Sequence, residues 1–249
     1  MKIYMVSLAF APARIMIESM RQVYETIGNI KYEHLLLNNH YPIDKKRNDK
    51  LLMTLLASYD CTLYDLESNV GLSAGYNFLI EKCNLQDEDI VLGIDPDVWP
   101  LTPGWGEALV KVLQADPTVG WASLNNIHSK KELQERGYTV HTIGGTVCYE
   151  GHTACVNSIC AWSGRFLKTF GGLKEQSKWY GGLEVTAFQR IKDLGFEWVY
   201  LPEFEEGWSP RVEADGPYRH YKWNLAHLKT TTFDFESWLL EDPARLKLV

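Results

Sequence analysis

One apolar run followed at once by two aspartates constrains the fold more than any other part of the sequence. The run Ile90–Ile94 (IVLGI) is uncharged and rich in β-branched residues, which is typical of a strand buried on both faces of a parallel sheet. Asp95 and Asp97 follow it, separated by Pro96. Proline fixes its own φ and favours an extended conformation in the residue before it, so the two carboxylates should leave the strand in a defined relation.

The position of this pair predicts a cation site. Open α/β sheets bind ligands at the carboxyl ends of their strands. Hard divalent cations take oxygen ligands, and Mg2+ or Mn2+ commonly bridges a carboxylate to phosphate oxygens. The alternative is a loop that carries two solvated acids.

Strands and helices alternate along the first half of the chain. The expected strands are 3–10, 32–38, 61–66, 90–94 and 119–124, and the expected helices are 12–27, 46–59, 73–83 and 104–115. A helix at 183–194 and a strand at 196–201 follow later, with Ser73 placed to cap the third helix and Pro202 to end the last strand. This alternation predicts βαβ units, and hence an α/β fold with a mostly parallel central sheet flanked by helices.

The regular alternation stops between residues 126 and 160. This stretch contains polar segments and two short β-like runs, 138–143 and 146–149, and long irregular inserts of this kind often form a lid or a substrate platform. A helix is expected at 218–228 in the tail. No repeat, low-complexity segment or linker divides the 249 residues, so we predict a single domain.

Composition excludes several classes of protein. Apolar residues make up 45% of the chain, enough for a substantial core, and the net charge of -7 argues against a nucleic-acid backbone as the main partner. The five cysteines are scattered and odd in number, which fits a reducing compartment, and those near His141 and His152 lack the C-x2-C spacing of a zinc site. The apolar stretch that ends at Phe10 is too short for a signal peptide or a membrane span. We therefore expect a soluble cytoplasmic protein.

The order of four motifs resembles that of family 2-like glycosyltransferases with the GT-A fold. N-V-G-L-S-A-G-Y-N at 69–77 is similar to their N-x-G-x-x-x-x-x-N motif, and Asp95 to Asp97 followed by Trp105 is similar to their (D/N)xD…W series. W-Y-G-G-L-E at 179–184, followed by Arg190 and Gly195, resembles their W-x-G-E-D…R…G segment. The resemblance covers residues 1–202. It implies a single GT-A domain with a nucleotide-sugar-binding half at 1–97, an acceptor-binding half at 98–202 and a C-terminal tail at 203–249.

The resemblance also implies an activity, the inverting, metal-dependent transfer of a hexose or pentose from a UDP- or GDP-linked donor to a hydroxyl acceptor. Asp97 is expected to hold Mn2+ or Mg2+, and Asp95 to lie towards the ribose and beside the metal. Breaking the glycosidic bond leaves a diphosphate with extra negative charge, which a cation neutralises. Glu184 takes the place of the family's catalytic Asp, whereas Leu183 replaces its Glu, which leaves acceptor specificity open.

Glu184 is accordingly the expected general base. A helix N-terminus favours its carboxylate form, and one base opposite the leaving group implies inversion at the anomeric carbon. The alternative is an ordinary helix N-terminal acid.

The remaining site residues are assigned by the same resemblance. Those expected at the donor are Ser7, Ala9, Arg14, Asn38, Asn39, Asn69, Gly71, Asn77 and Asp95, and those expected at the acceptor are Trp162, Trp179 and Tyr180. The alternatives are turn chemistry or capping for the asparagines and core packing for the tryptophans. Because Trp208 and Ser209 occupy the place of the family's C-terminal metal ligand, His220 is the fallback for that role.

Two other functions remain open. A sugar-nucleotide-forming nucleotidyltransferase usually has a G-x-G-T-R-like loop after its first strand, whereas this chain has SLAFAPAR there. A non-catalytic module that binds a nucleotide sugar or a carbohydrate is the second alternative. The acceptor also stays open among a saccharide, a lipid-linked sugar, a protein side chain and a modified base of DNA.

Overall fold

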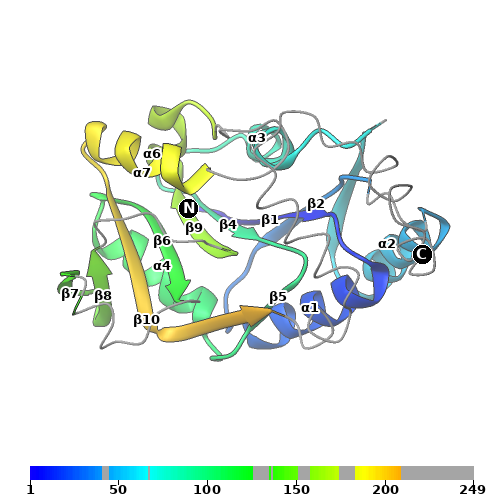
Figure 1. The fold of residues 1–249 in the computed structure, drawn as a ribbon, viewed down its shortest axis with the longest axis horizontal. Coiled ribbons are helices and arrows are strands. Elements are labelled where there is room, and N and C mark those ends of the chain that lie inside the picture. Colours follow the sequence, from blue (N-terminus) through cyan, green and yellow to red (C-terminus); the bar gives the residue numbers. More distant parts are fainter. Residues whose placement is uncertain are drawn as a thin grey trace.

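The computed structural model describes residues 1–40, 45–66, 68–125, 135, 137–150, 158–173 and 183–208, apart from the side chains of 13–14, 45–48, 51, 125, 183–186 and 207–208. Within them, ten strands form one sheet with helices on both faces (Figure 1). The strands are β1 Ile3–Ala9, β2 Glu33–Asn38, β3 Cys61–Asp65, β4 Ile90–Ile94, β5 Val98–Pro100, β6 Val119–Asn125, β7 Thr139–Ile143, β8 Thr146–Glu150, β9 Ile159–Ser163 and β10 Glu197–Trp208. The helices are α1 Ala13–Thr26, α2 Lys45–Ser58, α3 Leu72–Lys82, α4 Trp105–Ala115, α6 Gly164–Phe170 and α7 Leu183–Asp193.

The sheet has the order β3-β2-β1-β4-β9-β6-β10-β8-β7, and β5 pairs with β10 outside this path. The first four strands are parallel to one another, as are β6 and β10. Strand β9 is antiparallel to both β4 and β6, and β7 and β8 form an antiparallel pair next to β10. The predicted α/β class is confirmed, but the sheet is more mixed than the mostly parallel one expected. The difference arises because the chain between 138 and 163 contributes three antiparallel strands.

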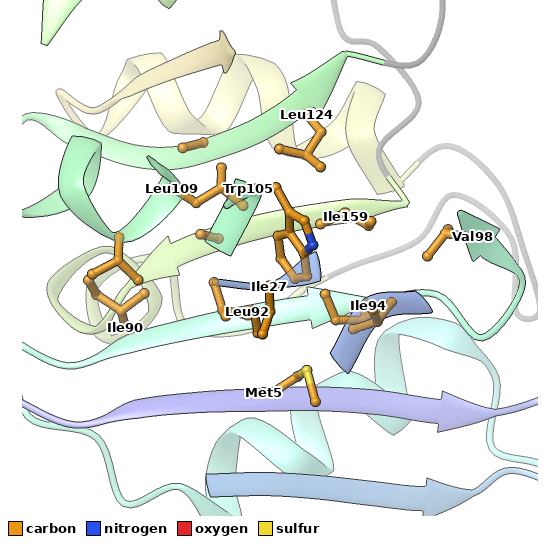
Figure 2. Close-up of a cluster of buried hydrophobic side chains, with 14 of the residues drawn as sticks. Met5, Ile27, Ile90, Leu92, Ile94, Val98, Trp105, Leu109, Leu124 and Ile159 are labelled. Atoms are coloured by element: carbon orange, nitrogen blue, oxygen red, sulfur yellow. The ribbon is translucent and has the colours of Figure 1, made fainter. Parts of the chain in front are cut away.

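Alternating residues of each central strand build two cores, one on each face of the sheet. Met5 of β1 and Leu92 of β4 face α1, α2 and α4, whereas Val6 and Val91 face α3, α6 and α7. Figure 2 shows part of the first core, where side chains of β1 and β4 lie near those of α4 and near Ile27, which directly follows α1. Because a strand turns successive side chains to opposite faces, this double burial explains the uninterrupted apolar runs.

Trp105 anchors α4 in the first core. Its side chain is fully buried, and its indole N–H donates to the hydroxyl of Thr26 at the end of α1, 3.1 Å away. A Cβ on Gly106 would lie 2.7 Å from the carbonyl oxygen of Ile27, so glycine permits the two helices to approach closely here. This tryptophan of the recognised motif therefore has a structural role.

Two predicted boundaries are wrong. Helix α3 begins at Leu72 with Gly71 as its N-cap residue at φ +87°, so Ser73 lies inside the first turn and does not cap it. Strand β10 does not end at Pro202 but continues to Trp208. The pairing with β6 shifts register between Leu201 and Glu205, and a proline is tolerated where the ladder is already interrupted.

Gly93 in the middle of β4 is required by the packing of the second core. A Cβ there would lie 2.4 Å from the indole ring of Trp162 on β9, closer than van der Waals contact allows. We expect Gly93→Ala to lower the free energy of unfolding by about 1–3 kcal/mol, measured by urea denaturation. Adding Trp162→Phe, which removes the clashing ring atoms, should recover part of this loss. A Gly93→Ala variant as stable as the wild type would contradict the close packing.

Candidate functional site

The carboxyl ends of β1, β2, β3 and β4 meet at one edge of the sheet because these strands are parallel. The register places Ala9 beside Asn38, and Asn38 beside Asp65. The predicted donor-site segments after β1, β2, β3 and β4 are therefore brought together, although they are distant in sequence.

Residues 95–97, which we call the acidic tip, follow β4 at this edge. Asp97 is fully buried and Asp95 is half-buried. The backbone N–H of Asp95 donates to the carbonyl of Ser158 at 2.9 Å, and the hydroxyl of Tyr76 donates to its carboxylate at 3.1 Å. Both ends of Asp95 are thus held by other elements. Sequence analysis missed Tyr76, although it stands directly before Asn77 in the recognised motif.

Glu206 is a second residue that sequence analysis missed. It lies near the end of β10 and is only 4% exposed, and its carboxylate accepts the backbone N–H of Ser158 at 3.1 Å. A buried carboxylate is costly unless hydrogen bonds or opposite charges compensate it. Glu206 was overlooked because the strand was expected to end at Pro202, which left it in an acidic tail.

Two of the asparagines shape the loop between β3 and α3. The amide of Asn39 is fully buried, accepting the N–H of Val70 at 3.0 Å and donating to the carbonyl of Gly71 at 3.3 Å. Asn69 accepts the N–H of Gly71 at 2.8 Å, which is an Asx turn. These side chains therefore position the loop around Gly71, and any contact with a donor would come in addition to that role.

Asn77 and Asn38 also bond to backbone. The Asn77 amide accepts the N–H of Leu173 at 2.8 Å and donates to its carbonyl at 2.9 Å, which ties α3 to the segment after α6. The Asn38 side chain accepts the N–H of His40 at 3.2 Å. Asn77 is accordingly a bridge between two distant segments.

Ser7 lies within β1, two residues before its carboxyl end, and contacts the buried side chain of His34. Its hydroxyl is 3.2 Å from Nε2 of His34, whose Nδ1 is hydrogen-bonded to the hydroxyl of Tyr24. Burial lowers the pKa of His34 to about 3, so the imidazole stays neutral in the folded protein.

This histidine predicts a loss of stability in acid. Below an ordinary pKa of 6.5 the unfolded chain takes up a proton that the folded chain does not, so the free energy of unfolding should fall as the pH drops from 6.5 towards 3. At 1.36 kcal/mol per pH unit, His34 contributes a loss of about 2 kcal/mol between pH 7 and pH 5. Urea denaturation at the two pH values should show a smaller difference for His34→Gln. An imidazole signal of His34 that titrates near pH 6.5 in NMR spectra would contradict the assignment.

The predicted acceptor residues are placed less completely. Trp162 is 1% exposed and packs edge-on against Tyr76 and Trp121, so it lies in the core with no face free for a sugar, contrary to its expected role. Helix α7 begins at Leu183, which puts Glu184 in its first turn. The side chains of Glu184 and Arg14, and the whole of Trp179, Tyr180 and His220, lie outside the described residues.

Arg190, the arginine of the recognised segment, joins two helices. Its guanidinium donates to the backbone carbonyl of Phe170 and lies 4.6 Å from the centre of the Phe170 ring. It therefore links α7 to the end of α6.

The acidic tip fits a divalent cation of the Mg2+ or Mn2+ type. Both side chains offer carboxylate oxygens, the donors that these ions prefer. Among the residues that the structure describes, no group of three His, Cys, Asp or Glu side chains is placed to hold a metal ion. Mg2+ is commonly held by one or two carboxylates with substrate phosphate and water completing its coordination, which matches this donor set.

A hollow of about 630 Å³ lies at the opposite edge of the sheet, where β1, β2, β3 and β4 begin. Its lining includes Lys2, Glu33, Cys61, Lys82 and Asp89. Asp89 is occupied by the backbone N–H groups of Lys2 and Gln86, and Glu33 pairs with Lys2 at 3.2 Å. Because ligands of such sheets bind at the carboxyl edge, the acidic tip and not this hollow is the candidate functional site.

The likeness of this structure to solved structures confirms the predicted GT-A fold. The structure is similar to that of GalNAc-T7, solved with UDP, GalNAc and Mn2+, with a TM-score of 0.64 and 13% identity over 83% of this chain and 43% of that one. It is similar to the mannosyltransferase PcManGT of Pyrobaculum calidifontis, solved with GDP-Man and Mn2+, with a TM-score of 0.62 and 15% identity over 99% of this chain and 73% of that one. It is also similar to TarS 1-349 of S. aureus in complex with UDP, with a TM-score of 0.57 and 11% identity over 92% of this chain and 67% of that one.

No family model matches the chain, and no curated protein matches it in sequence. The chain spans less than half the length of the GalNAc-T7 chain. In the part of the chain that the structure describes, every helix is too short or too polar to cross a membrane.

Proposed function

We propose that this protein is an inverting, metal-dependent glycosyltransferase that moves a sugar from a nucleotide-sugar donor to a hydroxyl acceptor. The observation that carries the proposal is the acidic tip, two carboxylates at the carboxyl end of β4 in a GT-A fold, with Asp95 held by Tyr76 and Ser158 and Asp97 fully buried. Three solved structures with this fold hold UDP or GDP-Man, two of them with Mn2+, which supports a nucleotide-sugar donor and Mn2+ or Mg2+ here.

The donor would lie along the carboxyl edge. The base and ribose face the ends of β1 and β2, near Ser7, Ala9, Arg14 and Asn38, and the backbone at Gly71 allows close approach. The diphosphate faces the acidic tip, with Asp95 towards the ribose and Asp97 towards the cation. When bound, the cation supplies positive charge that stabilises the departing diphosphate.

Glu184 is the proposed general base. It lies in the first turn of α7, where the helix dipole favours its charged form. It would take the proton of the acceptor hydroxyl as that oxygen attacks the anomeric carbon from the face opposite the diphosphate. Attack from that face inverts the anomeric configuration.

The acceptor side is proposed around α7, with Trp179 and Tyr180 as aromatic contacts for a sugar face. The acceptor is a saccharide, a lipid-linked sugar, a protein side chain or a modified nucleic-acid base. We propose a cytoplasmic location from the cysteine usage described above.

The test is incubation with Mn2+ and a panel of UDP- and GDP-linked sugars, with release of nucleoside diphosphate as the readout. Release that requires Mn2+ and stops with EDTA is the expected result. Formation or consumption of pyrophosphate would indicate a nucleotidyltransferase instead. The assay includes hydrolysis of the donor and transfer to each class of acceptor. Tight binding of a nucleotide sugar with neither reaction would indicate a non-catalytic module.

A further inference from the structure

We propose that Glu206 is a positioning residue that holds the acidic tip in place through Ser158. The inference rests on the proposed function, in which the acidic tip binds a cation and a diphosphate. Glu206 belongs to β10, which is more than one hundred residues away in sequence from the tip.

Two hydrogen bonds connect Glu206 to the tip. The carboxylate of Glu206 accepts the N–H of Ser158 at 3.1 Å, and the carbonyl of Ser158 accepts the N–H of Asp95 at 2.9 Å. Ser158 directly precedes β9, which is antiparallel to β4 with Ile94 opposite Ile159. One peptide segment thus transmits the position of Glu206 to the first residue of the tip.

The other side of the tip is held by the same strand. Strand β5 begins at Val98, directly after Asp97, and pairs antiparallel with the end of β10 (Figure 1). In this pairing Glu206 lies opposite Pro100, and Trp208 lies opposite Val98. The end of β10 therefore fixes the acidic tip from both directions, through Ser158 before it and through β5 after it.

The chemistry of Glu206 suits positioning rather than ligation. Its side chain is 4% exposed, and a carboxylate so deeply buried needs compensating bonds such as the one from Ser158. Within the described residues, Glu206 does not join Asp95 and Asp97 in a group of three that is placed to hold a metal. Its effect on a bound cation would accordingly pass through the backbone of Ser158.

Two conservative variants of Glu206 separate the effect of side-chain length from the effect of side-chain charge. Glu206→Gln keeps an oxygen at the same reach and loses the charge, whereas Glu206→Asp keeps the charge and withdraws the oxygen by one methylene. The matched control is Glu205→Asp, whose exposed side chain neighbours Glu206 and whose hydrogen bonds to Leu101 and Thr102 use only its backbone. The affinity of the full chain for UDP and for GDP is measured by calorimetry with and without Mn2+.

We expect Glu206→Gln and Glu205→Asp to bind the nucleotide in Mn2+ within about threefold of the wild type. We expect Glu206→Asp to bind about tenfold more weakly, which is the loss that one ordinary hydrogen bond predicts. The affinity without Mn2+ should be the same in all four proteins. Unchanged Mn2+-dependent affinity in Glu206→Asp would overturn the proposal. A larger loss in Glu206→Gln than in Glu206→Asp would also overturn it, because the charge rather than the reach would then matter. A wild type that shows no Mn2+-dependent binding would instead refute the proposed function.

Discussion

Replacing Asp97 with asparagine should abolish Mn2+-dependent binding of the donor and lower turnover by at least about 100-fold. Asparagine has nearly the same shape, so the buried site keeps its packing, but the charge that would hold the cation is lost. A cation held at a buried site acts on the diphosphate with little screening by water, which makes the loss large. Calorimetry with nucleoside diphosphate, in the presence and absence of Mn2+, measures the first effect, and release of nucleoside diphosphate from a nucleotide sugar measures the second.

Asp193→Asn is the matched control for this variant. Asp193 is an exposed residue of α7 that accepts a hydrogen bond from Gln189, so the same chemical change there should leave binding and turnover as they are. Thermal unfolding of both variants establishes that they are folded. Full Mn2+-dependent binding by a folded Asp97→Asn protein would remove the acidic tip from the site.

The carboxyl edge of the sheet could be predicted from the sequence because its causes are local. The apolar runs of β1 and β4 and the regular periodicity of the helices that follow them predict parallel strands from local sequence alone. Parallel strands collect their carboxyl ends at one edge, so the segments after Ala9, Asn38 and Ile94 had to be neighbours.

The second half of the sheet could not be predicted in the same way, because distant pairing decides it. Strand β9 inserts between β4 and β6, and nothing in ICAWS specifies those partners. Pro202 suggested an end to β10, yet the register shift beside it lets the strand continue. The role of Glu206 depends on both features, and periodicity in a single segment does not reveal it.

The roles of individual side chains also depend on contacts that are distant in sequence. Asn39 was singled out by its place after the second strand and Asn77 by its motif, but their hydrogen bonds go to the backbone of residues far away in sequence. Trp162 was assigned to the acceptor as an aromatic residue, whereas the neighbouring glycine on β4 makes room for it in the core. Residue types and motifs therefore suggested which side chains belong to a site, whereas the tertiary contacts show which backbone groups those side chains bind.

Glu184→Gln should keep the affinity for the donor while lowering turnover by about 100-fold or more, the usual scale for loss of a general base. Glutamine preserves the size and hydrogen-bonding reach of the side chain, but its amide cannot accept a proton from the acceptor hydroxyl. Donor affinity is measured by calorimetry in Mn2+, and turnover by release of nucleoside diphosphate at saturating donor. The effect should therefore appear in kcat and not in the donor KM.

The control for this variant is Glu81→Gln on the exposed side of α3, which should leave both quantities unchanged. NMR of the product adds a readout that does not depend on rate, because a single base opposite the leaving diphosphate requires inversion at the anomeric carbon. A product with retained configuration would exclude this geometry even if the Gln variant were slow. Unchanged kcat in a folded Glu184→Gln protein would show that another group takes the proton, and the first turn of α7 would then serve only to bind the acceptor.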